Sequence, residues 1–152
     1  MSELHDHDHS NDNEVLDMPS TNHSYIQIRI GGLFLDHDKF TPFSALTLDA
    51  NQIDLSKFCF LYRKDDLIPD VCLYESVHQF DPMHDVLKRS DMPVLAIEIL
   101  SPNQGTHEIM NKFDAYFALG IKSCWLVILA NESVTVYSSQ GNFNFKIKFN
   151  SV

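Results

Sequence analysis

A chain of 152 residues with 44% hydrophobic and 21% charged residues has the size and composition of one folded domain, which excludes a disordered or fibrous protein. Its formal net charge of -10 argues against a protein that holds nucleic acid by overall charge, because phosphate binding draws on Lys and Arg. Much of the acid lies in the first 17 residues, so a local cationic site is still compatible with the rest of the chain.

The first 17 residues, MSELHDHDHSNDNEVLD, have no apolar periodicity and little to bury, so we expect a disordered leader. We expect residues 18–152 to form a single domain. The leader alternates His5, His7 and His9 with aspartates. Imidazole and carboxylate groups suit zinc, nickel or copper, so metal binding by this run is an alternative to a solvated tail.

The sequence shows neither a membrane span nor a signal segment. No run reaches the roughly 20 apolar residues that a span requires, and the N-terminus is polar. We therefore expect a cytoplasmic protein. The three cysteines, Cys59, Cys72 and Cys124, have no C-x-x-C spacing, which favours reduced thiols over disulfides or a zinc site.

The first regular element is open to two interpretations. Residues 25–30 alternate like a strand, whereas a helix over residues 23–34 groups four apolar side chains on one face. These side chains are Ile26, Ile30, Leu33 and Phe34. The pair Gly31 and Gly32 weakens a helix by about 1 kcal/mol per residue relative to alanine, so local propensity does not decide between the two. The family resemblance given below favours the helix.

Several short strands are predicted next. Residues 44–48 and 58–62 are β-prone runs separated by polar turn residues. Residues 69–74 begin a further strand, since proline is accepted at a strand's first position, where it donates no ladder bond. Residues 75–92 are polar and rich in Asp, His, Met and Pro, which indicates a loop.

Residues 94–100 (VLAIEIL) form the most informative segment. They are apolar on both faces, as expected for a central strand covered on both sides, and the only break is Glu98. A carboxylate in such a strand costs several kcal/mol unless a cation or a proton compensates it. The segment therefore predicts that Glu98 has a specific partner.

A helix and further strands complete the pattern. Residues 106–119 have the spacing of an amphipathic helix, and Gly120 lies where a C-cap glycine belongs. The apolar run 123–129 predicts a second buried strand, so strand, helix and strand together predict a right-handed parallel crossover. Residues 134–137 and 143–149 alternate and predict an antiparallel pair. We expect an α/β protein of the mixed α+β kind, with one mixed sheet and a C-terminal antiparallel hairpin.

Asp70, Glu98 and Lys112 are the candidate chemical site. Two carboxylates on adjacent strands suit magnesium, a hard ion that accepts one or two carboxylates and keeps several waters. Such an ion would activate water for phosphodiester hydrolysis, and the Lys112 ammonium would stabilise charge on the phosphoryl oxygens. The alternative for Lys112 is a surface salt bridge with Glu108, four residues earlier on the same helix.

These motifs, in this order, resemble the Uma-type family of the PD-(D/E)XK restriction-endonuclease-like superfamily. The similarity extends from about Met18 to Tyr137. The segments that carry it are Pro69-Asp70-Val71, Pro93 to Pro102 (PVLAIEILSP), Lys112, Tyr116, Gly120 and Trp125-Leu126-Val127.

The resemblance implies a restriction-endonuclease-like αβββαβ core and hydrolysis of DNA. It implies that Asp70, Glu98 and the backbone carbonyl of Ile99 bind Mg²⁺, with Mn²⁺ as a substitute. The usual lysine of the superfamily falls at Leu100, and the Uma-type branch similarly carries one on the next helix, which matches Lys112.

Further expectations follow from the resemblance and from symmetry. Asn22-His23-Ser24 resembles the segment that opens the family's first helix, so His23 is a fourth, weaker candidate for the site. Tyr116 and Trp125 are expected in the core. A homodimer is expected, because two-fold pairs are the commonest assemblies and two sites are needed to cut two strands.

Two alternatives to a nuclease remain open. The chain has Ala45 and Leu129 where the family often has acidic residues, which favours a degenerate, non-catalytic member that acts as a binding or dimerisation module. The other alternative is a metal-handling protein that acts through its His/Asp leader.

Overall fold

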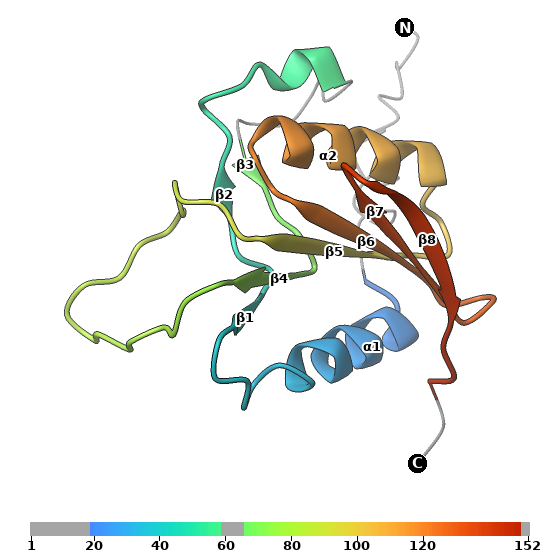
Figure 1. Cartoon of the computed structure of the whole chain (residues 1–152), viewed down its shortest axis with the longest axis horizontal. Helices are drawn as coiled ribbons and strands as arrows, with labels where there is room; N and C mark the ends of the chain where they lie inside the picture. The colour runs from blue at the N-terminus through green and yellow to red at the C-terminus, as the bar shows by residue number, and fades with distance from the viewer. Residues whose placement is uncertain (1–18, 59–65, 150–152) are drawn as a thin grey trace, which may run out of the picture.

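The computed structural model describes residues 19–58 and 66–149, and its centre is a six-stranded mixed sheet with a helix on each face (Figure 1). The helices are α1 (Thr21–Gly32) and α2 (Thr106–Ala118), with a short 3-10 helix, η1 (Leu55–Phe58). The main sheet has the order β1 (Thr41–Ser44), β4 (Val71–Tyr74), β5 (Leu95–Leu100), β6 (Ser123–Ile128), β7 (Ser133–Ser138) and β8 (Gly141–Lys146). A separate antiparallel pair consists of β2 (Leu48–Asp49) and β3 (Asp66–Leu67).

The predicted αβββαβ core is confirmed, with β2, η1 and β3 inserted between its first two strands. Only β5 and β6 are parallel, and α2 connects them, while every other pair in the main sheet is antiparallel. The crossover and the C-terminal hairpin of β7 and β8 are therefore as the sequence predicted. The chain has the mixed α/β architecture expected.

The strand β5 has one cluster of apolar side chains on each face. Ile97 and Ile99 point toward α1 and pack with Ile26, whereas Ala96 points toward α2 and packs with Phe113. This alternation explains why the segment is apolar throughout, because both faces of a central strand are covered. Glu98 is placed on the α2 side by the same alternation.

The first element is a helix rather than the alternative strand, and its N-cap is Ser20. The Ser20 hydroxyl accepts a hydrogen bond from the backbone N–H of His23 at 3.1 Å, which satisfies one of the free amides of the first turn. The helix buries His23 and Ile26 and ends at Gly32. Tertiary packing of this face against the sheet outweighs the poor helix propensity of the glycine pair.

The prediction of one strand over residues 44–48 is wrong. Its ends belong to β1 and β2, which lie in different sheets, because Ala45 has a φ of 51° and redirects the chain. The prediction over residues 58–62 is wrong at Phe58, which ends η1, and the remainder lies outside the described residues. Residues 75–92 form no helix or strand, as predicted.

The helix α2 ends as the sequence indicated. Leu119 is the C-cap, and Gly120 follows with a φ of +95°, a conformation in which a side chain would be strained. No helix in residues 19–58 and 66–149 is long and apolar enough to cross a membrane. Cys72 and Cys124 are free and buried; Cys59 and the leader lie outside the described ranges.

Candidate active site

Asp70 and Glu98 lie opposite each other where β4 and β5 separate. Val71 pairs with Ile97 in the antiparallel register. Asp70 is the residue before Val71 and Glu98 is the residue after Ile97, so the two acidic residues occupy the next opposing position. The Asp70 carboxylate contacts α1 and the β5 backbone, whereas the Glu98 carboxylate contacts α2. The negative charge of Asp70 raises the pKa of Glu98, as expected for neighbouring carboxylates.

The Asp70 carboxylate takes the place of a backbone hydrogen-bond acceptor for β5. Its Oδ2 atom accepts a hydrogen bond from the backbone N–H of Ile99 at 2.7 Å and lies 3.1 Å from Nε2 of His23. Gln27, one helical turn after His23, donates from Nε2 to the Asp70 backbone carbonyl at 2.9 Å and to the Ser44 hydroxyl at 2.7 Å. The helix α1 thus holds both the side chain and the backbone of Asp70.

Glu98 is buried, with 2% of its surface exposed, and has two partners on α2. The Tyr116 hydroxyl donates to Oε1 at 2.6 Å, and the Lys112 ammonium lies 3.4 Å from Oε2. Burial raises the pKa of Glu98 to about 7, although Lys112 and the Tyr116 hydrogen bond act in the opposite direction. The two partners therefore compensate the buried charge only in part.

The His23 side chain is buried beside both carboxylates. The hydrogen bond to Asp70 is the largest cause of its raised pKa, which burial opposes and the charges of Asp70 and Glu98 support. The backbone of Ile99 also forms a hydrogen bond that raises this pKa. The Nδ1 atom of His23 is buried without a hydrogen-bond partner. When protonated, His23 supplies positive charge to a site that is otherwise rich in acid.

All four candidate side chains therefore lie together. Lys112 forms its ion pair with Glu98 across the α2 interface, rather than the surface salt bridge with Glu108 that the sequence left open. Sequence reasoning assigned Tyr116 to the core, where it is fully buried, but missed that its hydroxyl binds Glu98. It also missed Gln27, because an exposed-face glutamine on a helix carries no signal of a partner 43 positions away.

The donor set fits a hard divalent cation better than a transition metal. Among the described residues, no three His, Cys, Asp or Glu side chains form a group that could hold a metal ion. Two carboxylates and a backbone carbonyl, completed by water, are instead the kind of ligand set that magnesium accepts. An ion between them would also supply the positive charge that the buried Glu98 lacks.

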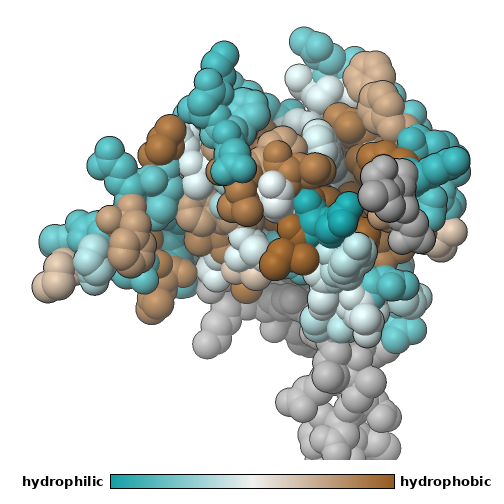
Figure 2. Space-filling model, turned by 90° about the horizontal axis from the view of Figure 1, so that it is seen from below, coloured by the Kyte–Doolittle hydropathy of each residue, from teal (hydrophilic) through white to brown (hydrophobic). Residues whose placement is uncertain are grey.

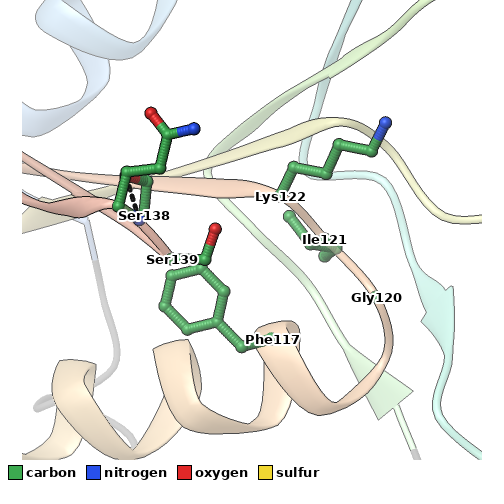
Figure 3. A pocket seen from close by; sticks show the side chains of 7 residues that line it. Phe117, Gly120, Ile121, Lys122, Ser138 and Ser139 are labelled. Atoms are coloured by element: carbon green, nitrogen blue, oxygen red, sulfur yellow. Dashed lines mark hydrogen bonds between the residues drawn. The ribbon is translucent and has the colours of Figure 1, made fainter.

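Two pockets on the described surface contain none of the four candidate residues. An open pocket of about 800 Å³ lies at the C-terminal end of α2 and contains no acidic side chain (Figure 3). Its lining residues are Phe117, Gly120, Ile121, Lys122, Ser138, Ser139 and Gln140. A smaller pocket of about 130 Å³ includes Asn22 and Ile26, which flank His23 on α1.

The raised pKa values predict that the metal-free protein loses stability as the pH rises toward neutrality. The native state holds a proton on Glu98 up to a pH of about 7, whereas the unfolded glutamate releases it near 4.5. Native protein thus binds more protons between these values, and its free energy of unfolding falls with pH by an amount on the order of 2 kcal/mol. His23, also raised, adds a fall above pH 6.5.

Urea unfolding at pH 5 to 8 in a chelator measures this slope. The carboxyl groups with lowered pKa values are Asp54, Asp81 and Asp91. They release their protons below pH 5 and therefore do not contribute to the slope between pH 5 and 8. In Glu98→Gln, the fall between pH 5 and 7 should be largely absent. A wild-type protein that gains stability over this range would contradict the burial of an ionisable Glu98.

Comparison with known proteins identifies the family and related folds. The family model described as Uma2, Putative restriction endonuclease, matches residues 4–147. A crystal structure of a putative nuclease belonging to DUF820 from Anabaena variabilis ATCC 29413 is similar, with a TM-score of 0.66 and 20% sequence identity over 86% of this chain and 70% of that one. No curated protein matches this chain. At this identity, the structural similarity demonstrates a shared fold.

Proposed function

Because this chain belongs to the Uma2 family of putative restriction endonucleases, we propose that it is a Mg²⁺-dependent endonuclease that hydrolyses DNA phosphodiester bonds. The observation that carries the proposal is Glu98. Its carboxylate is buried, lies in register with Asp70 and is paired with an ammonium group. A buried acidic cluster that is not fully compensated is costly to fold, and it is expected where it serves a function.

We assign metal binding to Asp70, Glu98 and the Ile99 carbonyl. Ile99 N–H and His23 both contact Oδ2 of Asp70, so Oδ1 is the oxygen that we assign to the ion. The N–H and C=O of one residue in an extended strand point to the same side, so the Ile99 carbonyl also faces the Asp70 side chain. When bound, Mg²⁺ would activate the attacking water and withdraw charge from the phosphoryl group.

Lys112, Tyr116 and His23 orient the two carboxylates and balance their charge. Lys112 lies next to Glu98 and can neutralise charge that develops on the phosphoryl oxygens. Tyr116 fixes the orientation of the Glu98 carboxylate, and His23 fixes that of Asp70. The acidic chain is an obstacle to DNA binding, but a divalent ion and Lys112 together make the site itself cationic.

A second candidate, a non-catalytic binding module, is favoured by two positions. The N–H of Ala45 donates to the Asp70 carbonyl at 3.1 Å, so a residue that is often acidic in the family is apolar at the edge of the site. Leu129 packs into the apolar cluster on the α1 side. Both changes reduce the number of carboxylates that could hold an ion.

One experiment separates these functions. We expect the full-length protein to nick supercoiled plasmid in Mg²⁺ or Mn²⁺ and to bind Mn²⁺ in calorimetry, and we expect Asp70→Asn to lose both properties. Asp85→Asn, which changes an exposed carboxylate far from the site, is the control. Deletion of residues 1–17 should preserve Mn²⁺ binding, whereas a leader-based metal protein would lose it.

The outcomes that contradict the proposal differ from one another. A folded wild type with no Mn²⁺ affinity and no nicking would support the binding module. Nicking that persists in Asp70→Asn would show that another site or a contaminant is responsible.

A further inference from the structure

The backbone of Asp70 lies just beyond the ends of the strand ladders on either side of it. On one side, the pairing of β4 with β5 ends at Val71 and Ile97. On the other side, β1 ends at Ser44, opposite Val71, and the chain turns away at Ala45, whose φ is 51°. The Asp70 side chain is 21% exposed, so its carboxylate needs further restraint if it is to hold one orientation toward an ion.

Gln27 on α1 provides a restraint at this point. Its side-chain amide donates from Nε2 to the Asp70 carbonyl at 2.9 Å and to the Ser44 hydroxyl at 2.7 Å, so both N–H groups of the amide are used. The Asp70 carbonyl also accepts from the backbone N–H of Ala45 at 3.1 Å. Gln27 therefore connects the helix to the last residue of β1 and to the residue before β4, where the pairing of these two strands ends.

Asp70 is restrained from its N-terminal side as well. Pro69 precedes it, is almost fully buried and has its φ angle fixed by the pyrrolidine ring. With Pro69 before Asp70 and the Gln27 amide on its carbonyl, the peptide groups on both sides of Asp70 are held. A fixed backbone leaves few positions for the carboxylate, because an aspartate side chain is short and its torsions occupy a few preferred rotamers.

His23 and Gln27 hold different parts of the same residue. The two side chains are four positions apart on α1 and so lie on one face of the helix. His23 contacts Oδ2 of Asp70 at 3.1 Å, whereas Gln27 contacts the carbonyl. Figure 2 shows the side of the molecule that carries α1, where hydrophilic and hydrophobic side chains are mixed. Gln27 is therefore distinguished by its contacts and not by its polarity.

We propose that Gln27 is a positioning residue for the candidate metal site, which fixes the Asp70 backbone so that Oδ1 faces the ion. The ion in this statement rests on the proposed function, whereas the effect of Gln27 on the Asp70 carboxylate does not. Gln27 is partly buried and acts through Asp70, without touching the reacting atoms itself. Loss of such an outer partner is expected to weaken metal binding by roughly 10- to 100-fold.

Exchange of the Ile99 amide proton, followed by NMR in a chelator, tests the positioning without any ion. This amide donates to Oδ2 of Asp70, so its protection reports whether the carboxylate is in place. Gln27→Met keeps the volume and helix propensity of the side chain but removes the donor. We expect the Ile99 amide of this variant to exchange about 10-fold faster, the effect of one weakened hydrogen bond. The Ile97 amide, inside the paired part of β5, should keep its wild-type rate.

A matched control makes the same chemical change elsewhere. Gln52→Met replaces an exposed glutamine outside α1 and should leave the exchange rates of both amides unchanged. The free energy of unfolding in urea, measured for both variants, shows whether Gln27→Met has destabilised the whole domain.

Calorimetry of Mn²⁺ binding at pH 8 tests the consequence for the ion. In Gln27→Met, we expect the dissociation constant to rise by roughly 10- to 100-fold, with a much smaller change in the nicking rate at saturating Mn²⁺. Gln27→Glu should also weaken binding, because a carboxylate cannot donate to the Asp70 carbonyl. If Gln27 acted only through local charge, the added negative charge would instead strengthen Mn²⁺ binding.

The contradicting outcomes are distinct. A wild-type exchange rate at Ile99 in Gln27→Met, or an equal acceleration at Ile97, would overturn the proposal, because the substitution would then have no effect or a general one. Tighter Mn²⁺ binding by Gln27→Glu would overturn it as well. A wild type that binds no Mn²⁺ would contradict the proposed function instead, and the exchange rates would then decide the positioning of Asp70 on their own.

Discussion

A Glu98→Gln variant is expected to lose nearly all cleavage activity while remaining at least as stable as the wild type at pH 8. The amide has the same shape and still accepts the hydrogen bond from Tyr116, but it has no negative charge for a divalent ion. Loss of a direct ligand should exceed the roughly 10- to 100-fold effect of removing an outer partner of a metal site. Stability is retained because removing the desolvation cost of the buried carboxylate offsets the loss of its ion pair with Lys112, whose side chain keeps 14% of its surface exposed.

Three measurements are needed together: nicking rate, Mn²⁺ affinity by calorimetry and the free energy of unfolding in urea. Most substitutions of buried residues destabilise, so lost activity at unchanged stability would identify a group retained for function. Rapid nicking by Glu98→Gln would remove Glu98 from the site. Unfolding of this variant would instead show that the carboxylate has a structural role.

Lys112→Met is expected to reduce cleavage by about 100-fold or more, the effect of removing one charge-stabilising group from a catalytic site. The methionine fills a similar volume but leaves Glu98 without its ammonium partner, so the pKa of Glu98 should rise above about 7. The pH at which the protein reaches half of its maximal Mn²⁺ binding should therefore rise as well. This shift distinguishes loss of the charge from a general loss of structure.

Two further substitutions serve as controls for Lys112. Lys122→Met removes an exposed lysine after α2 and should leave cleavage unchanged. Glu108→Gln tests the alternative surface salt bridge between Glu108 and Lys112, and it should also leave cleavage unchanged. A strong effect of Glu108→Gln, or full activity in Lys112→Met, would contradict the assignment of the ammonium to Glu98.

The sequence predicted the elements in which local pattern and tertiary environment agree. Glu98 was identified because it is the single charge in an apolar strand, and α2 because its period and its terminal glycine coincide. The strand over residues 44–48 failed because nothing in the pattern signals the φ of 51° at Ala45. Tertiary geometry there overrides β propensity.

The candidate site was predictable only in part. Asp70 and Glu98 were linked by their family pattern, and the register that places them opposite each other comes from the structure. The contacts of Tyr116 and Gln27 could not be inferred, because a tyrosine at a core position and a glutamine on a helix are ordinary residues until their partners are known. Long-range hydrogen bonds of this kind have no periodicity to reveal them.

The way in which Asp70 takes the Ile99 amide has a consequence for how such a site can arise and be lost. Backbone pairing between β4 and β5 ends at Val71 and Ile97. Beyond it, the Asp70 side chain accepts the Ile99 N–H in place of a backbone carbonyl of β4. The placement of the two acidic residues is therefore set by the point where β4 and β5 separate rather than by a loop. Substitutions that extend the pairing of β4 and β5 by two residues would keep both acidic residues in the sequence. They would nevertheless remove the position where an ion could bind.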